Sequence, residues 1–382
     1  MSGACRRVLF VGAFPPPGSA IFGGMVTSCR TLLASTLPAR VNLDLLDSTQ
    51  FSNPPPSLAV RLARAASRFV RFVARIESRR PDAVLLFVAV GASIVEKGAM
   101  AWYARVRGIP TLMFPRGASI IDACKSSWFT QTWVKASFRG AARIICQGSL
   151  WQAFAVEVLG FARNDVVVLR NWTATPELLR IGAARNARPL SPIRLLFVGW
   201  LERDKGIFEL LDACRHLLGT RQFTLDVVGE GHASIEAREL VARHGLTEVV
   251  HFLGWLQPKD LERVFTTADV FVLPSWAEGL PNAMIEAMAA RLAVVVTRVG
   301  AIPDVIADHY SGLLVAARDP ASLRHALQEI IDDTDLRERL AAEAYEIALR
   351  DFGVEAAVDK IIGEIEMTVL AGRVVRARDQ AR

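Results

Sequence analysis

Residues 193–211, IRLLFVGWLERDKGIFELL, contain the pattern that decides the fold. The apolar run at 193–199 has the composition of a buried strand, a polar loop follows it, and Gly206 stands where a helical pattern begins. The same order of apolar strand, loop and amphipathic helix recurs along the chain. Near-continuous apolar strands that alternate with helices are typical of parallel sheets covered on both faces.

Twelve such strands are expected, six in each half of the chain. In the first half they span 8–14, 41–47, 83–90, 111–114, 143–147 and 166–169. In the second half they span 193–199, 223–228, 249–253, 269–273, 293–297 and 313–315. We therefore predict an α/β fold of two Rossmann-like, doubly wound domains. Because open α/β sheets bind ligands beyond the carboxyl ends of their strands, two facing sheets would share a central cleft.

The length of 382 residues also favours two domains, since one hydrophobic core rarely serves a chain of this size. The stretch NWTATPELLRIGAARNARPLSP, at 171–192, lacks a strand pattern and is rich in Pro, Thr, Asn and Arg. We predict a first domain over 1–172, a linker over 173–192 and a second domain over 193–353. A helix over 354–382 is expected to pack back on the first domain.

Composition narrows the functional classes. The longest apolar run, 83–95, is interrupted by Gly91 and Ser93 and is too short to span a bilayer. The five cysteines are scattered, odd in number and never in a paired spacing, which argues against a disulfide framework or a zinc site and favours the cytoplasm. Residues 1–172 carry 21 Lys and Arg against 8 Asp and Glu, whereas the remainder carries 24 against 31. The first half is therefore expected to meet an anionic partner.

A basic amphipathic helix is expected at 61–80, RLARAASRFVRFVARIESRR. Its arginines recur at alternating three- and four-residue spacing, opposite Leu62, Ala66, Phe69, Val73 and Ile76; they are Arg61, Arg64, Arg68, Arg71, Arg75 and Arg79. A solvated face is the common explanation of such a stripe, but only Glu77 interrupts it. The pattern favours an anionic membrane surface. Nucleic acid is the alternative, although no nucleic-acid-binding signature accompanies the charge.

Three loops that follow strands hold candidate ligand groups. Gly23 and Gly24 open a helix after the first strand and suit a phosphate, although they equally suit a tight turn. Lys205 stands where the loop after the seventh strand becomes a helix, with Arg203 two residues before it. A lysine is unfavourable for the helix dipole, which favours a ligand role, although an exposed loop lysine is the equal alternative. After the eighth strand, VVGEGHAS has Ser234 where a third glycine would complete a dinucleotide fingerprint, so we interpret it as a turn and not an NAD site.

The loop after the tenth strand carries two glutamates eight positions apart, in PSWAEGLPNAMIEAMAA at 274–290. Pro281 suits a first helical position, so Glu278 lies in the loop and Glu286 lies inside the helix. Apolar residues flank Glu286 on both sides, which predicts that this carboxylate is buried. A buried carboxylate needs hydrogen-bond donors, and sugar hydroxyls are suitable ones.

The run EGLPNAMIE resembles the E-x7-E motif of retaining glycosyltransferases of family four, which have the GT-B fold. The similarity extends through FVGWLERDKGIFELL, VVGEGH, VHFLGWL, ADVFVLPS and VTRVGAIPDVI…SGLLV, and it covers nearly all of 193–316. The first half resembles the family more loosely. The resemblance implies that the second domain holds a nucleotide-sugar donor and the first domain holds the acceptor.

The resemblance also implies roles for individual residues. Glu286 would accept hydrogen bonds from the donor's ribose, Glu278 from a hydroxyl of the donor sugar, and Lys205 would neutralise the diphosphate that leaves. The donor-binding backbone would come from Gly279, Leu280, Pro281 and Asn282 beside the sugar and phosphate, and from Phe252 and Leu253 beside the base. Transfer would occur on one face of the sugar with retention, so Glu278 is not assigned as a general base. No metal and no cofactor are implied.

Two departures from the family pattern stand out. Trp200 stands where many relatives have an arginine that binds the diphosphate, and Arg203 is our candidate substitute. The six histidines all lie at or beyond His216, so the sugar-facing histidine of relatives is absent, and Arg116 in MFPRGAS is the candidate for that contact. The Asp-x-Asp sequence at 333–335 is interpreted as a helix cap rather than a metal site.

The sequence therefore predicts a hexosyltransferase that builds surface polysaccharide or glycolipid on a glycan or lipid-linked acceptor. It is expected to be cytoplasmic and peripheral on the membrane. A GT-B-like nucleotide-sugar epimerase or hydrolase is one alternative, although the first half has few groups for acid and base roles. A scaffold that binds sugar nucleotides without catalysis is another, and Trp200 is the feature that supports it.

Overall fold

The computed structural model of the protein describes residues 5–16, 21, 23–49, 56–89, 91–117, 119–185 and 192–380. Residue 90 of the expected strand 83–90, residues 186–191 of the expected linker and residues 381–382 of the expected last helix lie outside these ranges. The chain divides into two compact units. The first unit comprises Met1–Ile21, Met25–Arg170 and Val354–Arg382, and the second unit comprises Phe22–Gly24 and Asn171–Gly353.

The first unit is built on a parallel sheet of six strands in the order β2-β1-β3-β4-β5-β6. These strands are β1 (Arg7–Gly12), β2 (Asn42–Asp47), β3 (Ala83–Val88), β4 (Thr111–Pro115), β5 (Arg143–Cys146) and β6 (Val166–Val168). Every residue of β3 and β4 is buried. Strands that are apolar at each position have two buried faces, which is why helices cover both sides of the sheet.

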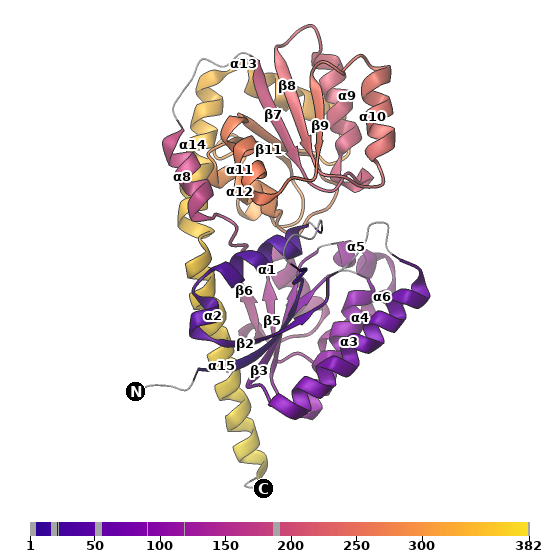
Figure 1. Cartoon of the computed structure of the whole chain (residues 1–382), viewed down its shortest axis with the longest axis vertical. Coiled ribbons are helices and arrows are strands. Elements are labelled where there is room, and N and C mark those ends of the chain that lie inside the picture. The colour runs from indigo at the N-terminus through magenta and orange to yellow at the C-terminus, as the bar shows by residue number, and fades with distance from the viewer. Residues whose placement is uncertain are drawn as a thin grey trace. The chain divides into compact units, whose positions relative to one another are not determined.

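The helices of the first unit connect these strands. They are α1 (Gly24–Ala34), α2 (Leu37–Arg40), α3 (Leu58–Arg79), α4 (Ala92–Val106), α5 (Ser119–Ser126), α6 (Trp128–Phe138), α7 (Ser149–Ala153) and α15 (Val354–Gln380). Helices α3, α4 and α6 pack side by side along one face of the sheet (Figure 1). Each of them connects parallel strands, so their amino-terminal ends lie at the carboxyl edge of the sheet.

The last helix, α15, is part of the first unit although it follows the second unit in the sequence. Its Lys360 donates a hydrogen bond of 2.6 Å to the carbonyl oxygen of Val168 at the end of β6. Farther along the helix, Glu364 pairs with Arg143 of β5, and both side chains are largely buried. Apart from the short segment Phe22–Gly24, the chain therefore passes into the second unit after Arg170 and returns to the first unit after Gly353.

The second unit repeats the architecture with a parallel sheet in the order β12-β11-β10-β7-β8-β9. Its strands are β7 (Ile193–Val198), β8 (Phe223–Val228), β9 (Val250–Gly254), β10 (Val270–Leu273), β11 (Ala293–Thr297) and β12 (Leu313–Val315). All twelve predicted strands are present, and the prediction of two doubly wound α/β domains is confirmed. Among the described residues, no helix has the length and apolar character needed to cross a membrane.

Seven helices cover the described part of the second sheet. They are α8 (Pro176–Ala184), α9 (Ile207–Leu217), α10 (Ser234–Arg243), α11 (Pro258–Thr267), α12 (Asn282–Ala289), α13 (Pro320–Asp332) and α14 (Thr334–Asp351). The predicted linker, 173–192, needs correction here, because α8 lies within it and packs against α11, α12 and α14. The Thr175 side chain caps α8 and Pro176 begins it, so local sequence signals favour this helix despite the polar composition.

Candidate functional site

The Lys205 loop connects β7 to α9 at the carboxyl edge of the second sheet. Lys205 ends a 3₁₀ turn, η3 (Arg203–Lys205), and Gly206 follows with a left-handed φ of 74°. A Cβ atom at Gly206 would lie 2.1 Å from the carbonyl oxygen of Pro274, which follows β10. Only glycine suits this position, because the left-handed backbone and the contact with Pro274 both exclude a side chain. The loops after β7 and β10 are therefore in direct backbone contact.

Lys205 and Glu278 form an ion pair across these two loops. The Nζ atom of Lys205 lies 2.6 Å from Oε1 of Glu278, and the same oxygen accepts a hydrogen bond of 2.8 Å from the Ser275 hydroxyl. The exposed fractions of the two charged side chains are 23% and 11%. The sequence-predicted catalytic residues, 73 positions apart, are thus brought together.

The ion pair keeps Lys205 charged. Burial alone would lower the pKa of Lys205, but the charge and hydrogen bond of Glu278, together with the charge of Asp204, outweigh burial, and the net pKa is raised. A charged ammonium that is largely shielded from water can stabilise an anion more strongly than a fully solvated one. Ser275 and Asp204 were missed by the sequence analysis, since no motif distinguishes them from ordinary loop residues.

Trp276 makes further contacts between the loops after β7 and β10. Its backbone N–H donates a hydrogen bond of 2.7 Å to the carbonyl oxygen of Asp204, beside Lys205. Its indole N–H donates one of 2.8 Å to Glu209, in the first turn of α9, and the guanidinium of Arg318 lies 4.3 Å above its ring. These contacts fix the position of the ammonium relative to Glu278.

The loop from Glu278 to Pro281 is also held from the side of β11. Gly300 has a φ of 59°, and a Cβ atom there would lie 1.9 Å from the carbonyl oxygen of Glu278. The neighbouring Ala301 N–H donates a hydrogen bond of 2.8 Å to the Gly279 carbonyl oxygen. Buried Gly279, Leu280 and the segment after β11 therefore form a rigid support beneath Glu278.

Glu286 lies in the second turn of α12, a helix in which seven of eight residues are buried. The exposed fraction of Glu286 is 8%, and burial raises the pKa of its carboxyl from 4.5 to about 7. Within the described ranges, no group donates a hydrogen bond to this carboxylate. A buried carboxylate without donors is costly, and a ligand that supplies hydroxyl groups would relieve that cost.

The amino terminus of α12 is organised around Asn282. Its side-chain amide donates a hydrogen bond of 2.7 Å to the Gly24 carbonyl oxygen, and its Oδ1 accepts one of 2.7 Å from Asn171. Asn171 also bonds the Leu280 carbonyl oxygen at 2.5 Å. In the described part of the chain, no side chain caps this helix end, where Pro281 is the N-cap. Its first N–H groups are the kind that bind phosphate.

The other residues predicted to bind the phosphates, Gly23, Gly24 and Arg203, make contacts of their own within the second unit. Gly23 has a φ of 136° and belongs with Gly24 to the second unit, and a Cβ atom there would lie 3.3 Å from the indole nitrogen of Trp200. Arg203 donates two hydrogen bonds, of 2.6 and 2.7 Å, to Glu236 of α10, and its side chain is 62% exposed. An anion bound at Lys205 would therefore compete with Glu236 for Arg203.

The glycines after β8 form a turn, as the sequence predicts. A Cβ atom at Gly229 would lie 1.8 Å from the Gly199 carbonyl oxygen, and one at Gly231 would lie 2.3 Å from the Leu201 carbonyl oxygen. Ser234, in the position of a third glycine, accepts a hydrogen bond of 2.9 Å from the Gly231 N–H. These glycines therefore serve the close approach of two loops.

The residues predicted to meet a base lie on β9. The guanidinium of Arg238 lies 4.5 Å above the Phe252 ring and bonds Glu230 at 2.9 Å. Leu253 is 39% exposed. The strand ends at Gly254, whose carbonyl oxygen accepts a hydrogen bond of 2.8 Å from Gly229. The ends of β8 and β9 are therefore joined by their backbones.

Arg116 follows β4 in the first unit, where its guanidinium donates a hydrogen bond of 2.5 Å to the Ser28 hydroxyl of α1. It also lies 4.8 Å above the Phe114 ring and 5.6 Å above that of Phe87. Burial lowers the pKa of Arg116 to about 10. A partly desolvated cation at the carboxyl edge of the first sheet suits an anionic or polyhydroxyl ligand.

The arginine stripe of α3 needs correction. Arg68 makes a bidentate pair with buried Glu96, with distances of 2.6 and 3.0 Å, and only 14% of its side chain is exposed. Arg75 donates a hydrogen bond of 2.6 Å to the Leu45 carbonyl oxygen, and Arg79 lies 2.9 Å from Asp44. Arg68 and Arg75 therefore hold α3 in place, because this part of the helix packs over the sheet. The predicted membrane surface does not include these two residues.

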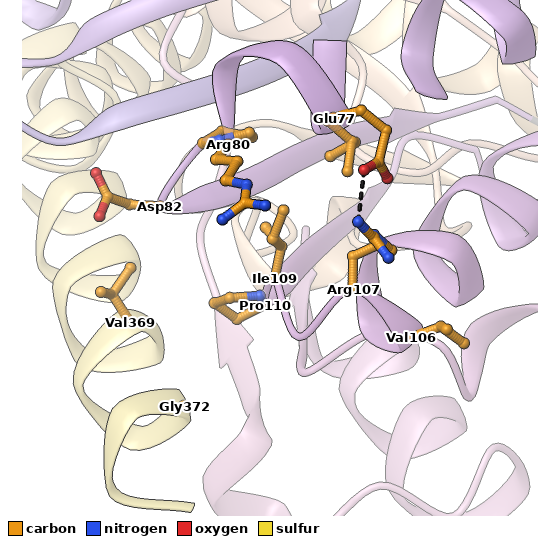
Figure 2. Close-up of a pocket in the computed structure, with 11 residues that line it drawn as sticks. Glu77, Arg80, Asp82, Val106, Arg107, Ile109, Pro110, Val369 and Gly372 are labelled. Atoms are coloured by element: carbon orange, nitrogen blue, oxygen red, sulfur yellow. Dashed lines mark hydrogen bonds and ion pairs between the residues drawn. The ribbon is translucent and has the colours of Figure 1, made fainter. Parts of the chain in front are cut away.

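A pocket of about 460 Å³ lies elsewhere in the first unit (Figure 2). Its lining comes from the segments before β3 and β4, from the ends of α3 and α4, and from Val369 and Gly372 of α15. In Figure 2, the Glu77–Arg107 pair and Val369 lie on opposite sides of it. The pocket contains none of the predicted site residues and lies at the amino edge of the sheet, opposite the edge at which α/β sheets bind ligands.

The Asp-x-Asp sequence at 333–335 is a helix cap, as predicted. Asp333 is the N-cap of α14, and its carboxylate accepts a hydrogen bond of 2.9 Å from the Leu336 N–H.

Sequence comparison with known proteins finds its family match in the second unit. The family model described as "Glycosyl transferases group 1" matches residues 183–347. The lipopolysaccharide core biosynthesis glycosyltransferase LpsE of Rhizobium meliloti (strain 1021) is 30% identical over 223 residues, which are 58% of this chain and 63% of LpsE. A glycogen synthase of Mycobacterium tuberculosis (strain ATCC 25618 / H37Rv) is 28% identical over 210 residues, 55% of this chain and 50% of that protein. The chain thus spans between half and two thirds of these curated relatives.

Solved structures resemble the whole chain. Sucrose-phosphate synthase from Thermosynechococcus elongatus has a TM-score of 0.77 at 20% identity and covers 96% of this chain and 99% of its own. Anabaena Alr3699/HepE in complex with UDP and glucose has a TM-score of 0.71 at 19% identity, with 94% and 99% covered. These likenesses confirm the expected GT-B fold. The residues that match the family model of glycosyl transferases group 1, 183–347, include Lys205, Glu278 and Glu286.

Proposed function

We propose that the protein is a retaining glycosyltransferase that moves a sugar from a nucleotide-sugar to a glycan or lipid-linked acceptor in surface polysaccharide or glycolipid synthesis. The observation that carries the proposal is the arrangement of Lys205, Glu278 and Glu286 around one loop and helix. It combines a shielded ammonium, a carboxylate paired to it and a second, buried carboxylate to which no described residue donates a hydrogen bond. The chemistry suits a diphosphate flanked by two sets of hydroxyl groups.

The donor would be held as follows. The diphosphate would bind at Lys205 and at the uncapped amino terminus of α12, where charge and backbone N–H groups act together. The ribose hydroxyls would donate to Glu286, and a sugar hydroxyl would donate to Glu278. As the glycosidic bond breaks, negative charge grows on the diphosphate, and Lys205 would stabilise it more in the transition state than in the ground state. The departing phosphate oxygen would accept the proton of the acceptor hydroxyl, so neither carboxylate serves as a base.

Relatives support a surface-glycan role. The name of LpsE places that protein in lipopolysaccharide core biosynthesis, and HepE was solved with UDP and with UDP-glucose. By analogy, we infer a nucleotide-sugar donor, of which the uridine series is the first to test. No metal or other cofactor is part of the proposal.

The test is a donor panel followed by product analysis. UDP-, GDP- and ADP-sugars are titrated by calorimetry, and the sugar linkage formed on an acceptor is read by NMR. An α-linked product from an α-linked donor supports retention, and a β-linked product contradicts it. Binding of a donor without transfer to any acceptor would favour the scaffold alternative, and conversion of the donor sugar without transfer would favour the epimerase or hydrolase.

A membrane surface on the first unit is the second part of the proposal. The first turns of α3 are exposed on all sides, with Leu58 at 65%, Leu62 at 61% and Arg61 exposed beside them, and Arg71 is exposed farther along the helix. Trp128 and Phe129, at the start of α6, are 77% and 66% exposed. A unit that exposes aromatic and aliphatic side chains as well as arginines suits the boundary of an anionic bilayer. A cytoplasmic protein that is peripheral on the membrane follows.

Vesicle flotation tests this surface. The double variant Trp128→Ser/Phe129→Ser is expected to lose binding to vesicles that contain anionic lipid, and Leu349→Ser, an equally simple change of an exposed apolar residue of the second unit, is expected to retain it. Equal binding by the two variants and by the unmodified protein would contradict the proposal.

A further inference from the structure

The pocket at the amino edge of the first sheet has the size of a small-molecule site. Its volume of about 460 Å³ lies within the range of about 300–1,000 Å³ that such sites occupy. Its inner walls are apolar, since the lining residues Ile76, Pro81, Ile109 and Val369 are all buried. They come from α3, from the segments before β3 and β4, and from α15. An apolar body that displaced water from these walls would gain hydrophobic free energy.

Four charged residues line the pocket, and only one of them has no hydrogen-bonded partner among the described residues. Glu77 pairs with Arg107 and accepts a hydrogen bond of 2.6 Å from the Tyr103 hydroxyl. Asp82 accepts a hydrogen bond of 3.0 Å from a backbone N–H of β1. For the guanidinium of Arg80, in contrast, no described residue accepts a hydrogen bond or forms an ion pair. Arg80 is therefore the charge that a ligand in the pocket could satisfy.

The backbone of Arg80 has an unfavourable conformation. Arg80 is the C-cap of α3, where its φ of 43° and ψ of 66° are left-handed. Helices usually end in this conformation at glycine, because a Cβ atom is unfavourable there. A residue that breaks such a local rule marks a functional or strained site. In Figure 2, the side chain of Arg80 extends toward Ile109 and Pro110, so its charge lies beside the apolar walls.

Gly372 leaves space on the α15 side of the pocket. It lies inside the helix, where glycine is less favourable than any other residue except proline. A Cβ atom at Gly372 would lie 3.8 Å from Cγ of Pro110, which is an ordinary contact, so close packing does not require glycine here. A larger side chain at this position would instead occupy the cavity. The glycine thus keeps the pocket open.

We propose that this pocket binds a small organic anion, a carboxylate or phosphate group on an apolar body. The anionic group accepts hydrogen bonds from Arg80, whose planar guanidinium matches the geometry of both groups. The apolar body lies against Ile109 and Val369. Because the walls come from α3 and α15, the ligand holds α15 to the rest of the first unit. The site shares no residue with the predicted donor site, so the inference goes beyond the proposed function and does not depend on it.

Calorimetry of the full-length protein with octanoate tests the site. Arg80→Gly removes the guanidinium and suits the left-handed backbone, so this variant should fold and should bind octanoate about 10- to 150-fold more weakly, the range for a lost hydrogen bond to a charged group. Gly372→Leu fills the cavity and should abolish binding. Octanol, which lacks the charge, and acetate, which lacks the apolar body, should each bind the unmodified protein at least about 10-fold more weakly than octanoate does.

Matched changes elsewhere in the first unit serve as controls. Arg139→Gly removes an exposed arginine at the C-cap of α6. Gly363→Leu makes the same change in α15 at a position where a Cβ atom would meet nothing within 4 Å. Both variants should bind octanoate as the unmodified protein does, and a thermal unfolding curve for every variant shows that it is folded.

Three results would overturn the inference. The first is equal affinity of the unmodified protein for octanoate and octanol, or no binding of octanoate at all. The second is unchanged octanoate affinity in folded Arg80→Gly and Gly372→Leu. The third is loss of octanoate binding in Lys205→Ala, which would place the anion at the predicted donor site. None of these results decides whether the protein transfers sugar, so the proposed function stands or fails by its own test.

Discussion

The ammonium of Lys205 lies 2.6 Å from the carboxylate of Glu278, although 73 positions separate the two residues. Both side chains are largely shielded from water, so each satisfies the charge of the other. A bound diphosphate would offer Lys205 a second anion and leave Glu278 able to accept a hydrogen bond from a sugar. The pair is therefore the point at which donor binding and charge stabilisation are coupled.

Removing the ammonium should affect turnover more than affinity. Lys205→Ala is expected to lower kcat by about 100- to 1,000-fold, as loss of one group that stabilises a transition-state charge does. Initial rates of nucleotide release with acceptor present measure the effect. Lys259→Ala, an exposed lysine of the same unit, is the control and should be unaffected. A variant at Lys205 that turns over normally would contradict the assignment.

Glu286 should make stability depend on pH. The pKa of its carboxyl is about 7 in the folded protein and 4.5 when exposed. Between pH 4.5 and pH 7, the folded state therefore keeps a proton on Glu286 that the unfolded state has lost. Stability therefore falls as pH rises from about 4.5 to about 7, and Glu286→Gln, which cannot ionise, avoids the fall. We expect Glu286→Gln to equal the original protein at pH 4.5 and to exceed it by up to about 3 kcal/mol at pH 8.

Urea unfolding at several pH values measures this difference. Glu248→Gln, an exposed carboxylate of the same unit, should track the original protein at each pH. Parallel stability curves for Glu286→Gln and the original protein would show that burial does not penalise this carboxylate. The same variant should bind a nucleotide-sugar more weakly at pH 8, because an amide is a poorer acceptor than a carboxylate.

The glycine between Lys205 and α9 should be irreplaceable for a steric reason. Gly206 and Gly219 have nearly equal φ values, 74° and 76°, but a Cβ atom meets the Pro274 carbonyl oxygen at 2.1 Å in the first case and nothing within 4 Å in the second. Gly219→Ala should cost about 1 kcal/mol of unfolding free energy, the left-handed penalty. Gly206→Ala should cost about 1–3 kcal/mol more, the cost of overpacking. Equal losses in urea unfolding would show that the contact relaxes freely.

The arginines of α3 should separate into two groups. Arg68→Ala leaves buried Glu96 with Lys97 as its ion-pair partner and is expected to cost about 3 kcal/mol of unfolding free energy. Arg61→Ala removes an exposed side chain and should change stability by less than about 0.5 kcal/mol. In vesicle flotation we expect the opposite ranking of the two variants: Arg61→Ala should bind anionic vesicles more weakly than Arg68→Ala does. Similar unfolding losses in both variants would contradict this division.

The sequence alone determined the twelve strands, because strands of a covered parallel sheet are near-continuous apolar runs, and this pattern is visible in a short window. It also determined the candidates Lys205, Glu278 and Glu286 and the turn at Gly229–Gly231, since loops after strands of a doubly wound sheet point to one edge. Helix α8 was missed as a helix because its polar composition resembles a linker. The roles of Phe252, Leu253 and Arg116 stay predictions.

Only the tertiary structure decided which charges meet. The sequence could not show that Ser275 and Asp204 support the Lys205–Glu278 ion pair. Nor could it show that Arg203 pairs with Glu236, or that Arg68 packs against Glu96 instead of facing solvent. Periodicity places side chains on the face of one helix or the edge of one strand, because it reflects local geometry. Partners that lie tens of residues away depend on how the elements pack, and that information is absent from any single segment.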